Sequence, residues 1–199
     1  MLAEVAGALR SAGQVAVLTG AGVSAESGIP TFRDTMTGPW ADYRPEDLAT
    51  PRGVRRNPDL VWSWYRMRRS AAAAARPTAG HLALAALERL VPGCTLITQN
   101  VDGPHARSGS RDVVELHGNI GRVKCFDCSR VPETFEDTEA VPRCPACGGM
   151  LRPDVVWFGE GLPPRALERA QQAAAGVEVF LSIGTSNVVA APWPDPPSV

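Results

Sequence analysis

The sequence predicts an α/β fold: a Rossmann-like parallel sheet with an inserted helical piece and a small module built on four cysteines. Short apolar, β-prone runs alternate along the chain with segments of helical periodicity, which is the pattern of a parallel sheet covered by helices. Four of the five cysteines form two Cys-x2-Cys pairs in a stretch with little apolar periodicity, as expected of a segment folded around a metal ion.

The N-terminal part predicts a helix, a strand and a second helix. Leu2–Leu9 has the spacing of a short amphipathic helix, and Val15–Thr19 is an apolar run typical of a strand. A further helix is expected from Ser24 onward. The Ile29-Pro30 pair should end it, because the residue before a proline disfavours the helical conformation. Residues 34–60 carry many turn formers and predict an ordered loop followed by the inserted helical piece.

The remaining segments alternate between helices and strands. We expect helices at Pro58–Ala75, His81–Leu90 and Arg165–Ala175, and strands at Thr95–Thr98, Val113–Leu116, Val155–Phe158 and Val179–Ile183. The proline-rich tail that begins at Pro192 suits neither a central strand nor a helix interior. The predicted division assigns residues 1–34, 81–117 and 153–190 to the sheet domain, 35–80 to the loop and helical insertion, 118–152 to the cysteine module and 191–199 to the tail.

Composition excludes several classes of protein. The 199 residues include 20 Lys and Arg against 21 Asp and Glu, a formal net charge of −1, so there is no basic field for nucleic acid and no polybasic patch for a membrane. No apolar run reaches the roughly 18 residues that a membrane span needs. The N-terminus lacks the basic region and the apolar core of a secretory signal. We therefore expect a cytoplasmic protein.

The cysteine spacing predicts a structural zinc site. Cys125-x2-Cys128, fifteen intervening residues and Cys144-x2-Cys147 fit two knuckles that supply four thiolates to one tetrahedral Zn²⁺. All four positions are filled by protein, so no place remains for water or substrate. Redox dithiols and a nucleic-acid-binding zinc ribbon are the alternatives. The near-zero net charge argues against the ribbon.

A glycine-rich turn follows the first predicted strand. Gly20-x-Gly22-x-x-Ala25 would place free backbone N–H groups at a helix start, where they suit a phosphate. Glycines lack a Cβ and let the backbone approach a ligand closely. The pattern alone fits a tight strand-to-helix turn equally well. Its continuation through Gly28, Ile29-Pro30 and Phe32-Arg33 is not required by any turn.

Polar residues also follow the second and third predicted strands. Thr98-Gln99-Asn100-Val101-Asp102 and His117-Gly118 stand at strand ends, where parallel sheets bind their ligands. A polar loop cap is the alternative for the first block. Imidazole can take up a proton near neutral pH, so His117 is a candidate base. His81, at a helix start, and His105, in a loop, are expected to be structural.

Taken together, these blocks resemble the sirtuins, the NAD-dependent protein-lysine deacylases, over roughly residues 1–190. The resemblance implies that the sheet domain binds NAD. Gln99 would contact the nicotinamide ribose, and Asp102 would help to hold the carboxamide. The implied NAD contacts are Gly20, Ala21, Gly22, Ser24, Ala25, Gly28, Pro30, Phe32, Arg33, Trp40, Gln99, Asn100, Val101, Asp102, Gly184, Thr185 and Ser186.

The resemblance also implies a reaction. The acyl-lysine carbonyl oxygen attacks the nicotinamide ribose and expels nicotinamide. His117 then deprotonates a ribose hydroxyl, and water near Asn100 completes deacylation to free lysine and O-acyl-ADP-ribose. Phe32 would shield the reactive ribose, and Arg33 would face phosphate. The block Val156-Trp157-Phe158-Gly159-Glu160 resembles the family's substrate strand, so Val156, Phe158, Gly159 and Glu160 are expected to bind acylated-lysine peptides by β-augmentation.

Three departures from the family stand out. Pro104 replaces the usual leucine before His105, and Asp154 stands where the subgroup commonly has histidine. After about Val189 the closing strands of the family fold, with a loop for the adenine half of NAD, are expected to be missing. The alternative function is therefore a catalytically impaired relic that acts as a zinc-containing binding domain.

A pair of residues on one predicted helix suggests the acyl group. Tyr65 and Arg68 are three apart and share a face, so hydroxyl and guanidinium could clamp a carboxylate. A solvated arginine-rich face is the alternative, since Arg66 and Arg69 are adjacent. The pattern Trp62-x-x-Tyr65-x-x-Arg68-Arg69 resembles the subgroup that removes succinyl and malonyl groups. We predict succinyl- or malonyl-lysine as substrate, with acetyl-lysine as a further one.

An ordinary NAD dehydrogenase is the other enzyme reading. It requires an acidic residue about 20 positions beyond the glycines, at the end of a second strand. Glu46 and Asp47 lie near that distance but in a proline-rich stretch with no predicted strand. This disfavours the dehydrogenase.

Overall fold

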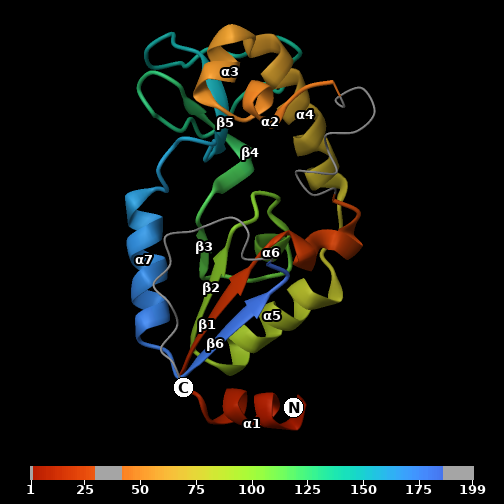
Figure 1. Cartoon of the computed structure of the whole chain (residues 1–199), viewed down its shortest axis with the longest axis vertical. Coiled ribbons are helices and arrows are strands. Elements are labelled where there is room, and N and C mark those ends of the chain that lie inside the picture. Colours follow the sequence, from red (N-terminus) through yellow and green to blue (C-terminus); the bar gives the residue numbers. More distant parts are fainter. Residues whose placement is uncertain (1, 30–41, 186–199) are drawn as a thin grey trace.

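The computed structural model describes residues 2–29 and 42–185 and shows two lobes (Figure 1). One lobe contains the parallel sheet, and the other combines short helices with an antiparallel hairpin. The tail and five of the predicted NAD contacts lie outside the described residues: Pro30, Phe32, Arg33, Trp40 and Ser186.

The main sheet has four parallel strands in the order β3-β2-β1-β6. Val17 of the central strand aligns with Leu96 on one side and Leu181 on the other. The chain first builds the sheet outward from β1 in one direction and then returns to add β6 on the other side. This reversal creates the crevice at which sheets of this kind bind ligands. The strands are β1 (Gln14–Thr19), β2 (Gly93–Thr98), β3 (Val113–Glu115) and β6 (Val179–Ile183).

Helices cover both faces of this sheet, which explains why its strands are continuous apolar runs. The face of Val15 and Val17 packs against α5 (Ala79–Leu90), with Leu9 of α1 (Leu2–Ser11) at the edge. The opposite face packs against α7 (Pro164–Ala175). The predicted strands at Val15–Thr19, Thr95–Thr98, Val113–Leu116 and Val179–Ile183 and the helices at His81–Leu90 and Arg165–Ala175 are confirmed in their order along the chain.

Proline starts the helices of the other lobe. α2 (Pro45–Leu48), α3 (Pro51–Arg56) and α4 (Pro58–Ala74) each begin with a proline, whose fixed φ and missing N–H suit the first helical position. The side chains of Thr50 and Asn57 accept backbone N–H groups as caps of α3 and α4. The turn formers in this stretch thus mark helix starts.

A hairpin completes this lobe. β4 (Gly118–Cys125) pairs antiparallel with β5 (Leu151–Val155) and shares a core with α4. The predicted strand Val155–Phe158 is wrong: β5 ends at Val155 and belongs to this separate sheet. Beyond it, the N–H groups bond to His117, Glu160 and Ala49 instead of a neighbouring strand.

The helix predicted from Ser24 is also wrong in type and position. The chain forms a 3₁₀ helix, η1 (Ala21–Ser27), directly after the first glycine. Gly28 ends it in the left-handed conformation, at φ +71°. The helix therefore stops before Pro30 can act on it. A one-turn helix, α6 (Pro104–Arg107), holds His105, which was expected in a loop.

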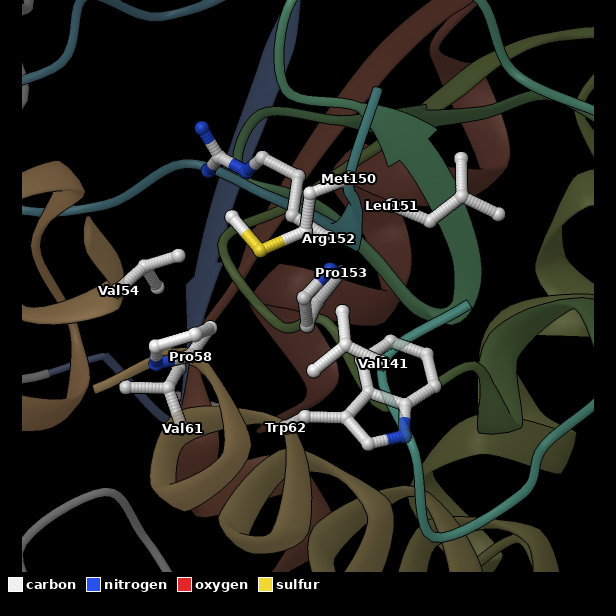
Figure 2. A pocket seen from close by; sticks show the side chains of 9 residues that line it. All are labelled: Val54, Pro58, Val61, Trp62, Val141, Met150, Leu151, Arg152 and Pro153. Carbon is white, nitrogen blue, oxygen red and sulfur yellow. The ribbon is translucent and has the colours of Figure 1, made fainter. Parts of the chain in front are cut away.

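A small apolar pocket lies where the helices meet the hairpin (Figure 2). None of the residues predicted to bind NAD or substrate lines it, so it marks the packing seam and not the site. No helix among residues 2–29 and 42–185 is long and apolar enough to cross a membrane. The lining residues are Val54, Pro58, Val61, Trp62, Val141, Met150, Leu151, Arg152 and Pro153.

Candidate active site and metal centre

The carboxyl ends of the four parallel strands bring the polar blocks of the sequence together. The backbone of Gly20 donates to the carbonyl of Ile183 at 3.0 Å, which joins the ends of β1 and β6. The backbone N–H of Gln99 donates to the carbonyl oxygen of Thr19, also at 3.0 Å, which joins the ends of β2 and β1. Thr185 closes the crevice by donating its hydroxyl to Oε1 of Gln99 at 3.2 Å. Residues far apart in sequence thus form one edge.

The glycines at this edge are needed for packing of backbone on backbone. A Cβ on Gly20 would lie 2.7 Å from the carbonyl oxygen of Gly184, and one on Gly22 would lie 2.8 Å from the Cα of Gly184. The N–H of Gly22 donates to that same carbonyl at 2.8 Å. The sequence predicted that a ligand would approach the backbone of Gly20 and Gly22 closely. In the described residues, the turn after β6 is what makes this close approach.

Asn100 is held by three hydrogen bonds. Its side-chain amide donates to the carbonyl of Gly20 at 3.0 Å and to Oγ of Ser24 at 3.3 Å, and its backbone N–H donates to Oγ1 of Thr98 at 3.0 Å. Because both side-chain bonds use the amide nitrogen, Oδ1 is the atom that could orient a water. The glycine turn and the Asn100 loop form one unit.

His117 has the geometry of a general base. Its Nδ1 lies 2.8 Å from the carbonyl oxygen of Gln99. A carbonyl can only accept, so Nδ1 carries a proton, and in the neutral ring the lone pair is on Nε2. The ring is half-buried just beyond β3. A second backbone contact supports the same turn, since the N–H of Val156 donates to the carbonyl of His117 at 2.9 Å.

Asp102 presents an acceptor that fits the nicotinamide end of NAD. Its Oδ1 is buried and has no hydrogen-bond partner among residues 2–29 and 42–185. A buried acceptor without a donor is costly, so it suits a ligand that brings an N–H group, such as a carboxamide. Burial lowers the pKa of the Arg68 guanidinium, and the Asp102 carboxylate opposes that effect.

Two histidines lie behind this edge, buried and with their ring centroids 4.6 Å apart. Nε2 of His81 faces Oγ of Ser24 at 3.4 Å, and Nε2 of His105 faces Oγ1 of Thr19 at 2.9 Å. Burial lowers the pKa of both imidazoles, that of His105 to about 4. Both rings are therefore neutral at physiological pH.

The predicted acyl clamp lies on α4 in aromatic surroundings. Tyr65 is buried, and its hydroxyl accepts from Nε1 of Trp157 at 2.9 Å. The half-buried guanidinium of Arg68 lies 4.6 Å from the ring centroid of Trp64 and 5.7 Å from that of Tyr65. Burial lowers the pKa of Arg68, against the opposing influence of Tyr65 and Asp102. A partly desolvated cation of this kind favours an anionic partner.

The neighbouring arginines show whether this helix presents a solvated arginine-rich face, which was the alternative to a carboxylate clamp. Arg69 is buried, 4.8 Å from the ring centroid of Trp62, and pairs with Asp137 at 3.1 Å. Arg66 is more exposed and lies near Glu139. Only Arg66 fits the solvated face that was the alternative.

The predicted substrate segment is an irregular turn. The N–H groups of Val156, Phe158 and Glu160 are already bonded within the chain, so a peptide would pair with other backbone groups there. Phe158 and Gly159 are exposed. The carboxylate of Glu160 accepts from Arg152 and from the N–H of Trp157, so its direct role is to shape this turn.

Asp154, where the resemblance led us to expect histidine, lies opposite Asn119 at a register shift of the hairpin. Its carboxylate lies 3.1 Å from Arg122 and 3.5 Å from Lys124, both on the paired strand β4. The substitution is thus matched by local charge.

The four paired cysteines form a cluster that fits zinc. Their sulfur atoms all lie within 4.8 Å of one another, with Cys125 to Cys147 at 3.5 Å and Cys128 to Cys144 at 3.8 Å. Thiolates at about 2.3 Å from one tetrahedral zinc would lie about 3.8 Å apart. Burial raises the pKa of Cys125, but backbone N–H donors from Cys128 and Asp127 outweigh it and lower the value to about 7. At Cys147 the N–H of Gly149 lowers the pKa, but the neighbouring cysteines outweigh it and raise the value to about 12, so the cluster favours a thiolate at Cys125 and a thiol at Cys147 until a cation binds.

Comparison with known proteins agrees with this geometry. A family model described as "Sir2 family" matches residues 20–191. An NAD-dependent protein deacylase of Deinococcus radiodurans is 54% identical over 194 residues, which cover 94% of this chain and 79% of that protein. A solved complex of a Sir2 homolog with NAD has a TM-score of 0.88 at 44% identity and covers 95% of this chain and 74% of the other.

A more distant structure extends the comparison to substrates. A Sir2 protein bound to a propionylated peptide matches with a TM-score of 0.77 at 30% identity, over 94% of this chain and 77% of that one. The family match begins directly after β1 and spans the glycine turn, the other three strands of the sheet, the Asn100 and His117 blocks and the four-cysteine module. By sequence and by structure, the chain belongs to the Sir2 family.

Proposed function

We infer that the protein is an NAD-dependent protein-lysine deacylase. The observation that carries this inference is the His117 imidazole, which donates from Nδ1 to Gln99 and keeps its Nε2 lone pair at the same sheet edge as Asn100 and the interlocked glycine turns. The relatives named as NAD-dependent protein deacylases support it.

Each residue at the edge has a chemical task. NAD, when bound, supplies a ribose that takes over the acyl group as nicotinamide leaves. Nε2 of His117 accepts a proton from a hydroxyl, as its tautomer allows. Oδ1 of Asn100 orients water, since the amide nitrogen is already engaged. Oδ1 of Asp102 accepts from the carboxamide.

We propose that the preferred acyl groups are succinyl and malonyl. A guanidinium held half-buried between Trp64 and Tyr65 offers a carboxylate a charge-assisted hydrogen bond. The Asp102 carboxylate opposes the effect of burial on the pKa of Arg68, which supports a site in which the acyl and nicotinamide ends adjoin. The proposed partners are acylated lysines on cytoplasmic proteins, with Phe158 and Gly159 exposed for the peptide.

Nicotinamide release tests the activity and a pair of variants tests the acyl group. Purified protein, NAD and matched succinyl-, malonyl- and acetyl-lysine peptides should give nicotinamide and free lysine. In Arg68→Met, kcat/KM for the succinyl peptide should fall about 100-fold, a typical cost of losing a charge-assisted bond, with little change for acetyl.

Arg66→Met is the matched control, because it removes an arginine of the same helix whose ion pair faces solvent. It should leave desuccinylation near the wild-type rate. Full desuccinylation by Arg68→Met would refute the clamp. Absence of nicotinamide release with every peptide would refute the activity itself and favour a zinc-containing binding domain.

A further inference from the structure

A chain of buried hydroxyl groups connects His105 to the backbone of Asn100. Nε2 of His105 lies 2.9 Å from Oγ1 of Thr19, and that oxygen lies 2.9 Å from Oγ1 of Thr98. Thr98 in turn accepts the backbone N–H of Asn100 at 3.0 Å. His105, Thr19 and Thr98 are at most 3% exposed, so water does not compete for these bonds.

The direction of the protons follows from counting donors. Oγ1 of Thr98 accepts from Asn100, and the hydroxyl of Thr19 donates to Thr98. The one proton of the Thr19 hydroxyl is directed at Thr98 and at the more distant carbonyl oxygen of Ile97, 3.5 Å away, so the Thr19 oxygen accepts from His105. His105 then has its proton on Nε2, and its Nδ1 is the unprotonated atom that has no partner among the described residues.

The other buried histidine reaches the same asparagine by a separate route. The backbone N–H of Thr78 donates to Nδ1 of His81 at 3.0 Å, which places the proton of that ring on Nε2. Nε2 of His81 faces Ser24, whose hydroxyl accepts from the Asn100 side chain at 3.3 Å. The two routes hold the side chain and the backbone of Asn100 separately.

We propose that His105 is a positioning residue for catalysis: through Thr19 and Thr98 it fixes the backbone from which Asn100 reaches the reacting groups. The inference rests on the proposed deacylase function. His105 is buried and reaches Asn100 only through the hydroxyl groups of Thr19 and Thr98, so it acts through other residues. A donor on Nε2 is required, and an imidazolium would supply it only at the cost of burying a charge.

The decisive comparison is Thr19→Val against Thr19→Ser. Valine keeps the shape of threonine and removes the hydroxyl, whereas serine keeps the hydroxyl. We expect Thr19→Val to lower kcat about tenfold. This is the effect expected when one buried hydrogen bond that helps to arrange the transition state is lost. Thr19→Ser should restore kcat to within about twofold. Equal kcat for valine and wild type would overturn the proposal.

Val17→Ala separates positioning from stability. Val17 is fully buried in the same strand, two residues away and outside the hydroxyl chain. It should lower the melting temperature and leave kcat near wild type when assayed below that temperature. If Val17→Ala loses as much stability as Thr19→Val and its kcat falls by the same factor, the positioning role is overturned. Should Thr19→Val not fold, His105→Gln and His105→Leu replace it: glutamine offers an N–H donor near Nε2, and leucine offers none.

Two NMR readouts do not depend on activity. ¹⁵N shifts of the imidazole should report the Nε2–H tautomer of His105. Hydrogen exchange of the Asn100 amide should be at least about tenfold faster in Thr19→Val than in Thr19→Ser. A Nδ1–H tautomer, or unchanged exchange, would refute the hydroxyl chain even in an active enzyme. Absence of nicotinamide release with confirmed NMR behaviour would instead refute the deacylase function alone.

Discussion

The indole N–H of Trp157 donates to the hydroxyl of Tyr65 at 2.9 Å, and both rings are buried. Tyr65 belongs to α4, whereas Trp157 follows the hairpin strand β5. The bond fixes one side of the proposed acyl clamp to the segment that shapes the peptide site. Acyl recognition and peptide recognition therefore share a structural support.

Breaking this bond should weaken desuccinylation more than deacetylation. Trp157→Phe removes the donor, so the Tyr65 hydroxyl loses the partner that orients it. We expect kcat/KM for a succinyl peptide to fall roughly tenfold, equivalent to one buried hydrogen bond. A double-mutant cycle with Tyr65→Phe measures the coupling. Additive losses in the two single variants would contradict the shared support.

His117→Ala should abolish most of the activity and leave the fold intact. The variant removes the Nε2 lone pair, and general-base catalysis typically contributes about 100- to 10,000-fold. The ring is only half-buried, so the melting temperature should change little. Steady-state kinetics and thermal unfolding together check this. A residual rate above about a tenth of wild type would assign the proton transfer to another group.

Elemental analysis should find one zinc per chain, and its removal should unfold the hairpin lobe. Cys125 and Cys144 pack with Trp62 and Leu151, so loss of the metal exposes a core that includes α4. A chelator should lower the melting temperature together with the zinc content. Cys144→Ser should have the same effect. Cys94→Ala, at the buried cysteine of β2, is the control and should keep its zinc.

Stability should decline as the pH falls from about 6.5 to about 4. Burial lowers the pKa of His105 to about 4 in the folded chain, against an ordinary value of 6.5. The unfolded chain therefore binds more protons in this range, and protonation favours unfolding. This loss of stability is absent above about pH 6.5 and amounts to about 3 kcal/mol by pH 4. Burial of His81 acts in the same direction.

Urea unfolding at several pH values measures this predicted decline in stability, and His105→Gln is the comparison variant. Glutamine does not titrate, so the variant should lose less stability between pH 6.5 and 4 than the wild type. The same pH slope in both would show that other groups, such as paired carboxylates, dominate the acid range.

The sheet lobe was predictable because helices cover both faces of its sheet and its strands are therefore apolar runs. Val15–Thr19 and Val179–Ile183 are apolar runs of strand length between helical segments, and both form strands of the sheet. The segment Val155–Phe158 has the same local character and yet ends a hairpin strand. An apolar run does not specify which neighbour it will pair with, since pairing depends on distant chain.

The residue types of the candidate site could be predicted from the sequence, whereas their contacts could not. Asn100 and His117 were found because polar residues follow apolar strands, and the family resemblance assigned their roles. The contribution of His105 was missed. Only the fold brings its ring to Thr19, on a strand 86 positions earlier in the chain.

The sequence by itself determined the inventory of this protein: a glycine turn, four thiols at zinc spacing, an imidazole at a strand end and an arginine three residues after a tyrosine. Tertiary structure decided how these groups behave. It set a proton of His117 on Nδ1, buried Oδ1 of Asp102 without a hydrogen-bond partner in the part of the chain that the structure describes, and partly desolvated Arg68. Tautomer and desolvation depend on atoms that folding brings from distant segments, and no local pattern contains them.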